Sequence, residues 1–208
     1  VATTCAAQWW AFAPTVSGTP GEDWKALDHN KQIVVTAENA SSFPGSYGIS
    51  IISKIPVQHW LRHELGRSRI GMPLAIAGEK GQLRLLYVRD EPRVALAAVL
   101  ENGWTVINVH LSFVPLFNIF QLWKVSRWAK FIEKKYASRV IIVGDLNLPW
   151  SIPTQVTRWS RATSALTYPS WNPKISFDYI LTRKFDKTLT KEVSFKQLPV
   201  SDHRPIAI

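Results

Sequence analysis

Cysteine is nearly absent from this chain, which has Cys5 alone among its 208 residues. One thiol cannot form an intramolecular disulfide, and one thiol with five histidines argues against a thiolate zinc site. Also absent are internal repeats, low-complexity tracts and any apolar run near the roughly 18–20 residues of a membrane span. The sequence therefore excludes a disulfide scaffold and a repeat architecture, and its length fits one domain over residues 1–208.

Acidic residues are scarce relative to basic ones: 15 Asp and Glu stand against 25 Lys and Arg, for a net charge of +10. The isoelectric point is near 9.9. Such a surface favours anionic partners such as phosphate groups, nucleic acid or acidic lipid headgroups. A generally basic, soluble protein would show the same balance, so charge alone separates these possibilities poorly.

Residues 1–46 have little pattern, and a short apolar run at 33–36 is their only candidate strand. No basic segment precedes the apolar residues near the start, which argues against a signal peptide within them. Residues 47–53 alternate between polar and apolar types, which predicts a strand that Pro56 ends.

A basic stretch follows between residues 59 and 69 and includes Trp60. It could contact a phosphate backbone, but a solvated loop or an edge strand is the more ordinary explanation of such charges. Its basic residues are His59, Arg62, His63, Arg67 and Arg69.

The middle of the chain predicts three strands, at residues 83–88, 94–100 and 104–110. A link over 89–93 joins the first two, and a turn at Gly103 precedes the third. Successive strands with short links favour an antiparallel meander.

Residues 116–136 predict the longest helix. Its apolar residues recur at near-helical spacing, which predicts a stripe that faces the core, and basic residues populate the other face. The stripe consists of Leu116, Ile119, Phe120, Trp123, Trp128, Phe131 and Ile132.

Residues 140–147 read Val-Ile-Ile-Val-Gly-Asp-Leu-Asn, which predicts a buried strand that stops at a glycine. Asp145 and Asn147 follow it two positions apart, so in extended backbone their side chains would share one face. A carboxylate and an amide oxygen together can bind one hard cation. For an isolated Asp-x-Asn, an Asx turn that caps the strand is the commoner outcome.

Polar residues recur at other predicted strand ends. A lone histidine or aspartate beside a strand is usually an edge residue, but recurrence predicts that these groups line one rim of a shared sheet. The residues are His110, Asp178, Asp202 and His203, beside predicted strands at 104–110, 177–181 and 206–208, and a further short strand is predicted at 193–195.

The chain resembles the endonuclease/exonuclease/phosphatase (DNase I-like) superfamily through five short motifs that occur in the family's order. Any one of them is weak, whereas five in order with sensible spacing are specific. Residues 12–15 and 111–115 also resemble a bacterial, actinobacterial-like branch. The motifs are Tyr-Gly-Ile-Ser-Ile-Ile-Ser-Lys-Ile-Pro at 47–56, Asn-Val-His-Leu at 108–111, Gly-Asp-Leu-Asn at 144–147, Phe-Asp-Tyr-Ile-Leu at 177–181 and Ser-Asp-His-Arg-Pro at 201–205.

The resemblance implies a four-layer α/β sandwich, in which two mixed sheets pack face to face with helices outside. It implies hydrolysis of a phosphodiester or phosphomonoester with Mg²⁺ or Mn²⁺. The implied partner is a phosphoester substrate (nucleic acid, a lipid headgroup or a small ester). The resemblance implies no stable protein partner and suggests a monomer.

The resemblance also gives roles to the matching residues. Asp145 would orient or deprotonate the attacking water, and Asn147 would hold a phosphate oxygen or the metal. His203 would contact the scissile phosphate, and Asp178 would orient this histidine. His110 would contact phosphate or protonate the leaving oxygen.

Two further residues complete the implied site. Asp202 would lie on its metal side, which makes Asp202, Asp145 and Asn147 the implied metal ligands. Arg93, within Glu-Pro-Arg at 91–93, is a weaker match for a phosphate contact. The residue types suit the chemistry, because phosphoester hydrolysis needs a cation, a positioned water and a proton for the leaving oxygen.

One part of the family pattern is missing. The family's domain opens with a strand that ends in Asn, then a helix, then a strand with a Gln-Glu pair whose glutamate is the principal metal ligand. Gln8 here precedes Trp9, and Glu22 and Glu38 lack the motif. We therefore expect an N-terminally truncated domain that lacks the first strand-helix-strand unit, and in which the strand before Asn147 lacks a neighbour.

Two alternatives to the enzyme are open at this point. The chain could be a basic binding module that keeps the fold and lacks the metal-binding glutamate. It could also be a lipid phosphodiesterase at a membrane surface, which ten tryptophans and the positive charge suggest. The residues do not identify the substrate, because specificity depends on loops without a recognisable motif.

Overall fold

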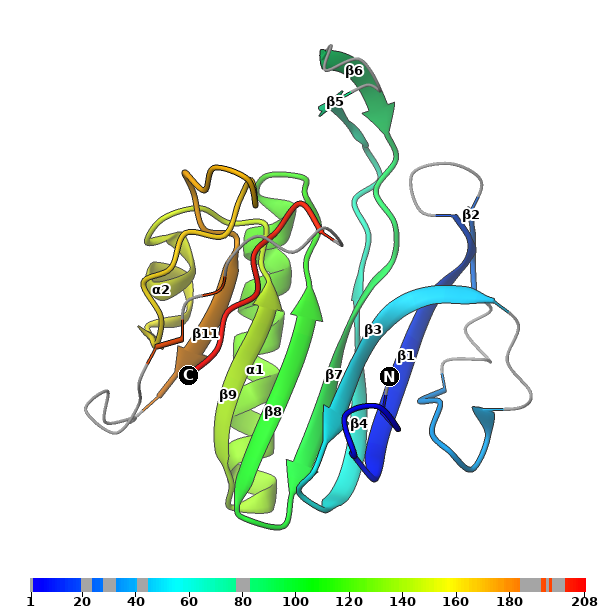
Figure 1. Cartoon of the computed structure of the whole chain (residues 1–208), viewed down its shortest axis with the longest axis vertical. Coiled ribbons are helices and arrows are strands. Elements are labelled where there is room, and N and C mark those ends of the chain that lie inside the picture. Colours follow the sequence, from blue (N-terminus) through cyan, green and yellow to red (C-terminus); the bar gives the residue numbers. More distant parts are fainter. Residues whose placement is uncertain are drawn as a thin grey trace.

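The computed structural model describes residues 2–19, 24–27, 33–40, 45–77, 83–183, 192–193, 195 and 201–208. Two sheets and two helices form its body (Figure 1). The elements are β1 (Trp9–Gly18), β2 (Trp24–Ala26), β3 (Ser46–Ser53), β4 (Val57–Gly66), β5 (Met72–Ala77), β6 (Leu83–Val88), β7 (Arg93–Leu100), β8 (Trp104–His110), α1 (Phe117–Tyr136), β9 (Arg139–Asp145), α2 (Ile152–Thr157), β10 (Ser160–Arg161) and β11 (Asp178–Thr182).

A six-stranded mixed sheet forms the centre, in the order β10-β11-β9-β8-β7-β4. Strands β8 and β9 are parallel and α1 connects them, as a parallel pair requires a crossover, whereas the other neighbours are antiparallel. Strand β9 therefore has a hydrogen-bonded neighbour on each side. The expectation that this strand would lack a neighbour is wrong, because β8 and β11 supply both.

A three-stranded antiparallel sheet, β2-β1-β3, packs against one face of the central sheet (Figure 1). Small residues of β1, Ala11 and Ala13, meet Val94 and Leu96 of β7 in the interface. This packing confirms the predicted α/β sandwich, although the described strands of the smaller sheet are all antiparallel and not mixed as expected. Strand β1 was not among the predicted strands, because its core-facing side chains include alanines, which give a weak hydrophobic pattern.

Helix α1 covers the other face of the central sheet, with Leu122, Val125 and Ile132 fully buried against it. The helix was predicted correctly, but its core-facing stripe was partly wrong. The buried face includes the polar residue Gln121, whose side chain bonds the backbone of both Ser112 and Gly66. These bonds satisfy the buried amide, so a polar residue can occupy the core face. The apolar residues Phe120, Trp123 and Phe131 are instead 45–59% exposed.

Neither described helix has both the length and the apolar character needed to cross a membrane. The shorter helix, α2, packs against α1 on the same side of the central sheet. Among the described residues, the helical layer thus lies on the six-stranded sheet.

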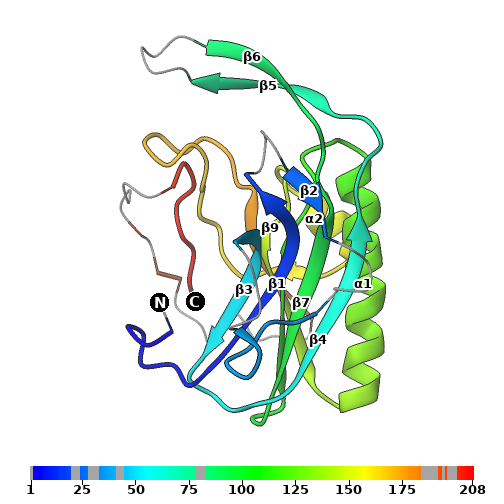
Figure 2. The same ribbon diagram turned by 90° about the vertical axis from the view of Figure 1, so that its right-hand side faces the viewer.

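The predicted three-strand meander is only half correct. Strands β7 and β8 pair as expected, but β6 pairs with β5 in a separate two-stranded hairpin. The other neighbour of β7 is β4, which lies at the edge of the six-stranded sheet. The basic residues of β4 thus lie on an edge strand, which was one of the two ordinary explanations given for the basic stretch. The hairpin projects beyond the body and overhangs one end of the sheets (Figure 2).

The strands predicted near the C-terminus do not form ladders in the described residues. Val193 and Ala207 make one isolated antiparallel bridge. Residue 194 lies outside the described residues, and 206–208 form no strand. The apolar triplet ends a segment that is fixed by side-chain and loop contacts, for example from Arg204 to the carbonyl oxygen of Ser170 at 2.6 Å.

Candidate active site

Three of the predicted site residues lie side by side on adjacent strands. His110 of β8 is the register partner of Asp145 of β9, and Asp145 is the register partner of Asp178 of β11. Directly opposed residues point to the same face of a sheet, so register alone brings these three side chains together. Asp178 is at the start of its strand rather than at the end, because β11 runs antiparallel to β9.

Gly144 allows β9 to bend just before Asp145. Its φ of +123° is rare for residues with a side chain, and a Cβ there would overlap the carbonyl oxygen of Val109. A glycine at this point therefore lets β9 approach β8 closely where the site begins.

Asn147 does not continue the strand. Its φ is +49°, and its backbone N–H donates to Asp145 Oδ1 at 2.8 Å, which is the Asx-turn arrangement. The shared face of an extended backbone was thus the wrong geometry. Its side-chain Nδ2 donates to the carbonyl oxygen of Leu111, so the turn holds the amide beside the end of β8.

His203 reaches the strands from the C-terminal segment. Its Nδ1 donates to Asp178 Oδ2 at 2.7 Å, and its ring lies 5.0 Å from that of Tyr168. Burial lowers the pKa of His203, but the hydrogen bond to Asp178 and the charges of Asp178 and Asp145 outweigh it and raise the pKa above its usual value. The imidazole is therefore biased toward its charged form, which suits an anionic ligand.

His110 is biased in the opposite direction. Burial, with the charges of Arg93 and His203, lowers its pKa to about 3. The neutral ring lies between the Tyr47 hydroxyl, 3.2 Å from Nδ1, and Asp145 Oδ2, 3.5 Å from Nε2. Burial also raises the pKa of Tyr47, so its hydroxyl keeps its proton. When that hydroxyl donates to Nδ1, the proton of the neutral His110 ring is on Nε2, facing Asp145.

Asp145 is the most perturbed carboxylate of the site. Burial and the neighbouring charge of Asp178 raise its pKa to about 6, despite the opposing effect of His203. Ligand atoms of Asp145, Asp178 and His203 lie within 4.8 Å of one another. Two close carboxylates that repel each other, with an imidazole beside them, are a donor set that fits a divalent cation.

Asp202 and Arg93 lie differently from the other predicted residues. Asp202 is exposed and does not contribute to the group of close ligand atoms found in the described residues; it raises the pKa of His203 by its charge. Arg93 is buried, and its Nη2 donates to Glu91 Oε1 at 3.1 Å. Both residues are thus near the site, and their direct roles stay predictions.

Tyr47 was missed as a site residue. It opens the motif at 47–56, but it belongs to β3 of the smaller sheet and reaches His110 across the interface between the sheets. A small cavity between the sheets is lined by Tyr47, Arg93 and His110 together with Thr15, Gly48, Ile49 and Val94. A tyrosine in a strand gives no signal of such a contact, because the contact depends on how two sheets pack.

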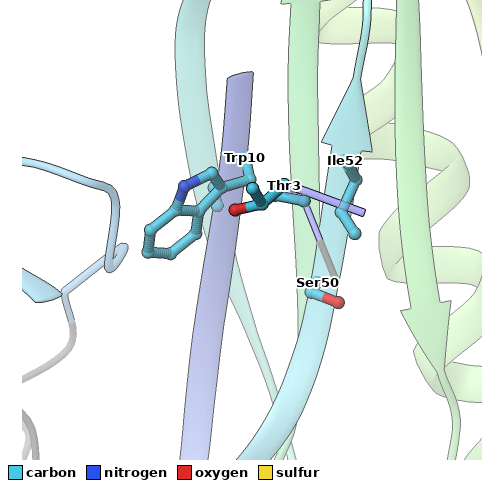
Figure 3. A pocket seen from close by; sticks show the side chains of 6 residues that line it. Thr3, Trp10, Ser50 and Ile52 are labelled. Atoms are coloured by element: carbon cyan, nitrogen blue, oxygen red, sulfur yellow. The ribbon is translucent and has the colours of Figure 1, made fainter. Parts of the chain in front are cut away.

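A larger hollow, of about 350 Å³, lies on the smaller sheet. It is formed by the N-terminal turn with Thr3 and by Trp10, Ser50 and Ile52 of β1 and β3 (Figure 3). Its lining has no titratable side chain, so it offers no acid–base chemistry.

The sequence matches the model of one known protein family over most of its length. The model of the endonuclease/exonuclease/phosphatase family matches residues 5–203. The chain belongs to this family. Among proteins of curated function, none matches the sequence.

Several solved structures are similar to this endonuclease/exonuclease/phosphatase family chain. A conserved protein of unknown function from Enterococcus faecalis V583 is 17% identical, with a TM-score of 0.53 and coverage of 76% of this chain and 69% of that chain. A mannosyl-6-phosphatase from Bacteroides thetaiotaomicron is 13% identical (TM-score 0.49, coverage 76% and 68%). The catalytic domain of human Nocturnin is 15% identical (TM-score 0.47, coverage 88% and 62%). At 17% identity the likeness to the Enterococcus protein concerns the fold alone.

Proposed function

We propose that this family member hydrolyses phosphoesters with the help of a divalent cation. The observation that carries the proposal is the convergence of Asp145, Asp178 and His203, with ligand atoms within 4.8 Å, beside the neutral ring of His110. Membership of the family supports it independently. A binding module would need neither a carboxylate with a raised pKa nor a second histidine of opposite protonation at the same place.

Asp145 is the residue best suited to position and deprotonate the attacking water. A general base works best when its pKa lies near the working pH, and burial brings the pKa of Asp145 to about 6. The charged ring of His203, which Asp178 orients, would contact the scissile phosphate. His110, whose neutral ring can donate a hydrogen bond from Nε2 but carries no second proton to give up, would bind a phosphate oxygen, and Asn147 would hold another.

The carboxylates of Asp145 and Asp178 would hold Mg²⁺ or Mn²⁺, and the charged ring of His203 beside them would face the phosphate rather than the metal. When bound, such a cation supplies charge neutralisation at the phosphate oxygens. Asp145 would then face the water in its deprotonated form. Asp202 would not bind the cation directly; its carboxylate would add negative charge near the cation from the exposed side of the site.

The test is hydrolysis of bis-nitrophenyl phosphate with Mg²⁺ or Mn²⁺ and with EDTA. We expect turnover only with the cation, and we expect Asp145→Ala to lower kcat at least about a hundredfold, as a lost general base does. The matched control is Glu101→Gln, an exposed acid in the turn between β7 and β8 at the other end of the sheet, which should keep full activity.

Three results would contradict the proposal: turnover that survives EDTA, an Asp145→Ala variant as active as the parent, or no turnover on any phosphoester tested. In the last case, tight binding of inorganic phosphate without hydrolysis would favour the alternative of a basic binding module. The net charge of +10 supports that alternative only weakly, because it suits any anionic partner.

A further inference from the structure

The most exposed large apolar side chains of the described residues share one end of the molecule. Single exposed apolar residues are normal on protein surfaces, but a group of them marks an interaction surface. Six such side chains are 60–78% exposed, and Phe131, at 59%, comes next among the described residues. The six, here called the apolar rim, are Ile70, Leu85, Tyr87, Leu116, Trp150 and Trp171.

Three members of the apolar rim belong to the projecting hairpin. Leu85 and Tyr87 are on β6, and Ile70 lies just before β5. The hydroxyl of Tyr87 accepts the backbone N–H of Gly71 at 2.9 Å, which ties the side chain to the base of the hairpin. The hairpin leads into β7 at Arg93, on the same end of the central sheet as His110, and it overhangs that end (Figure 2).

The other three members lie on loops that carry or contact the site. Leu116 precedes α1, whose Asn118 donates to the carbonyl oxygen of Asn147. Trp150 follows Asn147 by three positions. Trp171 is the neighbour of Ser170, whose backbone N–H donates to the carbonyl oxygen of Asp202.

The charges beside the apolar rim are mainly basic. Arg67, Arg69 and Arg89 are exposed at the base of the hairpin, and two of them stack on the ring of Trp24, 5.4 and 5.5 Å from its centre. The acids next to these arginines, Asp90 and Glu91, are buried, whereas Asp202, whose carbonyl oxygen accepts from Ser170 beside Trp171, is an exposed acid. The end that carries the site therefore presents apolar tips together with arginines.

We propose that the apolar rim docks on a phospholipid bilayer that contains anionic lipids, and that it brings headgroup phosphates to the site. This deepens the proposed function, on which the choice of substrate rests. Aromatic and leucine side chains enter the interface between headgroups and acyl chains, and arginines bind the anionic headgroups. A soluble nucleic acid would bind the arginines but would leave the aliphatic tips Ile70, Leu85 and Leu116 in water.

The test is co-sedimentation with large vesicles of phosphatidylcholine, alone or mixed with phosphatidylglycerol, in EDTA so that no lipid is hydrolysed. We expect binding to the mixed vesicles and much weaker binding to the neutral ones. The double variant Leu85→Ser with Tyr87→Ser should weaken binding at least about tenfold, and Trp171→Ser should weaken it less. The control is Phe131→Ser, which removes an equally exposed ring from the far half of α1 and should bind like the parent.

The outcomes separate this proposal from the proposed function. A parent protein that stays in the supernatant with both vesicles overturns the docking, even if it cleaves bis-nitrophenyl phosphate. Vesicle binding that Phe131→Ser weakens as much as the rim variants places the surface elsewhere and also overturns it. A dimer in solution that the rim variants convert to monomers, without vesicle binding, would assign the rim to a second copy of the chain. Vesicle binding without turnover on any ester would sustain the docking and refute the enzyme.

Discussion

The two ends of the central sheet are built differently. At the site end, Leu116, Asn147 and Trp150 have φ values of 65°, 49° and 55°, a region that residues other than glycine rarely adopt, whereas at the opposite end Ala137 has such a φ (49°) as the ordinary left-handed residue that ends α1. Two carboxylates also face each other there, on Asp145 and Asp178. Such strain and repulsion persist only where the surrounding structure enforces them, and they are typical of functional sites.

At the opposite end the polar groups satisfy one another. The hydroxyls of Thr105 and Ser138 are buried and 2.8 Å apart. Asn102 accepts the backbone N–H of Trp104, and the carbonyl oxygen of Gly103 accepts that of Arg139. This end therefore stabilises the fold, whereas at the site end strain and repulsion between reactive groups offset part of the free energy of folding. Removing a reactive group at the site end should lower activity more than stability, and removing a polar group at the opposite end should lower stability more than activity.

The largest difference between the effect on activity and the effect on stability is expected for Asp178→Asn. The amide keeps the size of the side chain but loses the charge that orients His203 and opposes ionisation of Asp145. We expect kcat on bis-nitrophenyl phosphate to fall about a hundredfold, the scale of a disabled acid or base. In EDTA the melting temperature should rise or stay unchanged, because the repulsion between carboxylates is relieved. A variant that melts clearly lower than the parent would show that Asp178 is a stabilising residue instead.

A smaller effect is expected from a matched pair of glycines. Gly144 and Gly103 both have positive φ, but a Cβ at Gly144 would meet the backbone of Val109, whereas one at Gly103 would meet nothing within 4 Å. Gly103→Ala should cost about 1 kcal/mol of unfolding free energy, and Gly144→Ala about 2–3 kcal/mol or more. Urea unfolding measures both, and equal costs would contradict the close approach of β8 and β9 at the site.

The smallest effect on activity is expected at the far end, from Thr105→Val. The change leaves the buried hydroxyl of Ser138 without its partner and should cost about 1–2 kcal/mol, with activity unchanged. Removing both hydroxyls, by Thr105→Val with Ser138→Ala, should cost less than the sum of the two single changes. Additive costs, or a loss of activity at this distance from the site, would break the distinction between the two ends.

Local patterns were sufficient for the elements with the clearest hydrophobic signal. Strand β9, with its run of β-branched residues, and helix α1, with its helical spacing, both appear where they were predicted. Strand β1 and the pairing of β6 were not predicted correctly. Alanines give β1 a weak pattern, and a strand's choice of partner is decided by packing far along the chain.

The sequence by itself determined which groups are available: Asp145, Asn147, Asp178, His110 and His203, each next to an apolar segment or motif. Only the tertiary structure decided how they meet. Register places His110, Asp145 and Asp178 on one face, and a segment without a strand brings His203 to them. Tyr47 joins from another sheet. These contacts join residues 25 and 63 positions apart, and no local pattern encodes them because they depend on strand order and sheet packing, which the whole chain stabilises together.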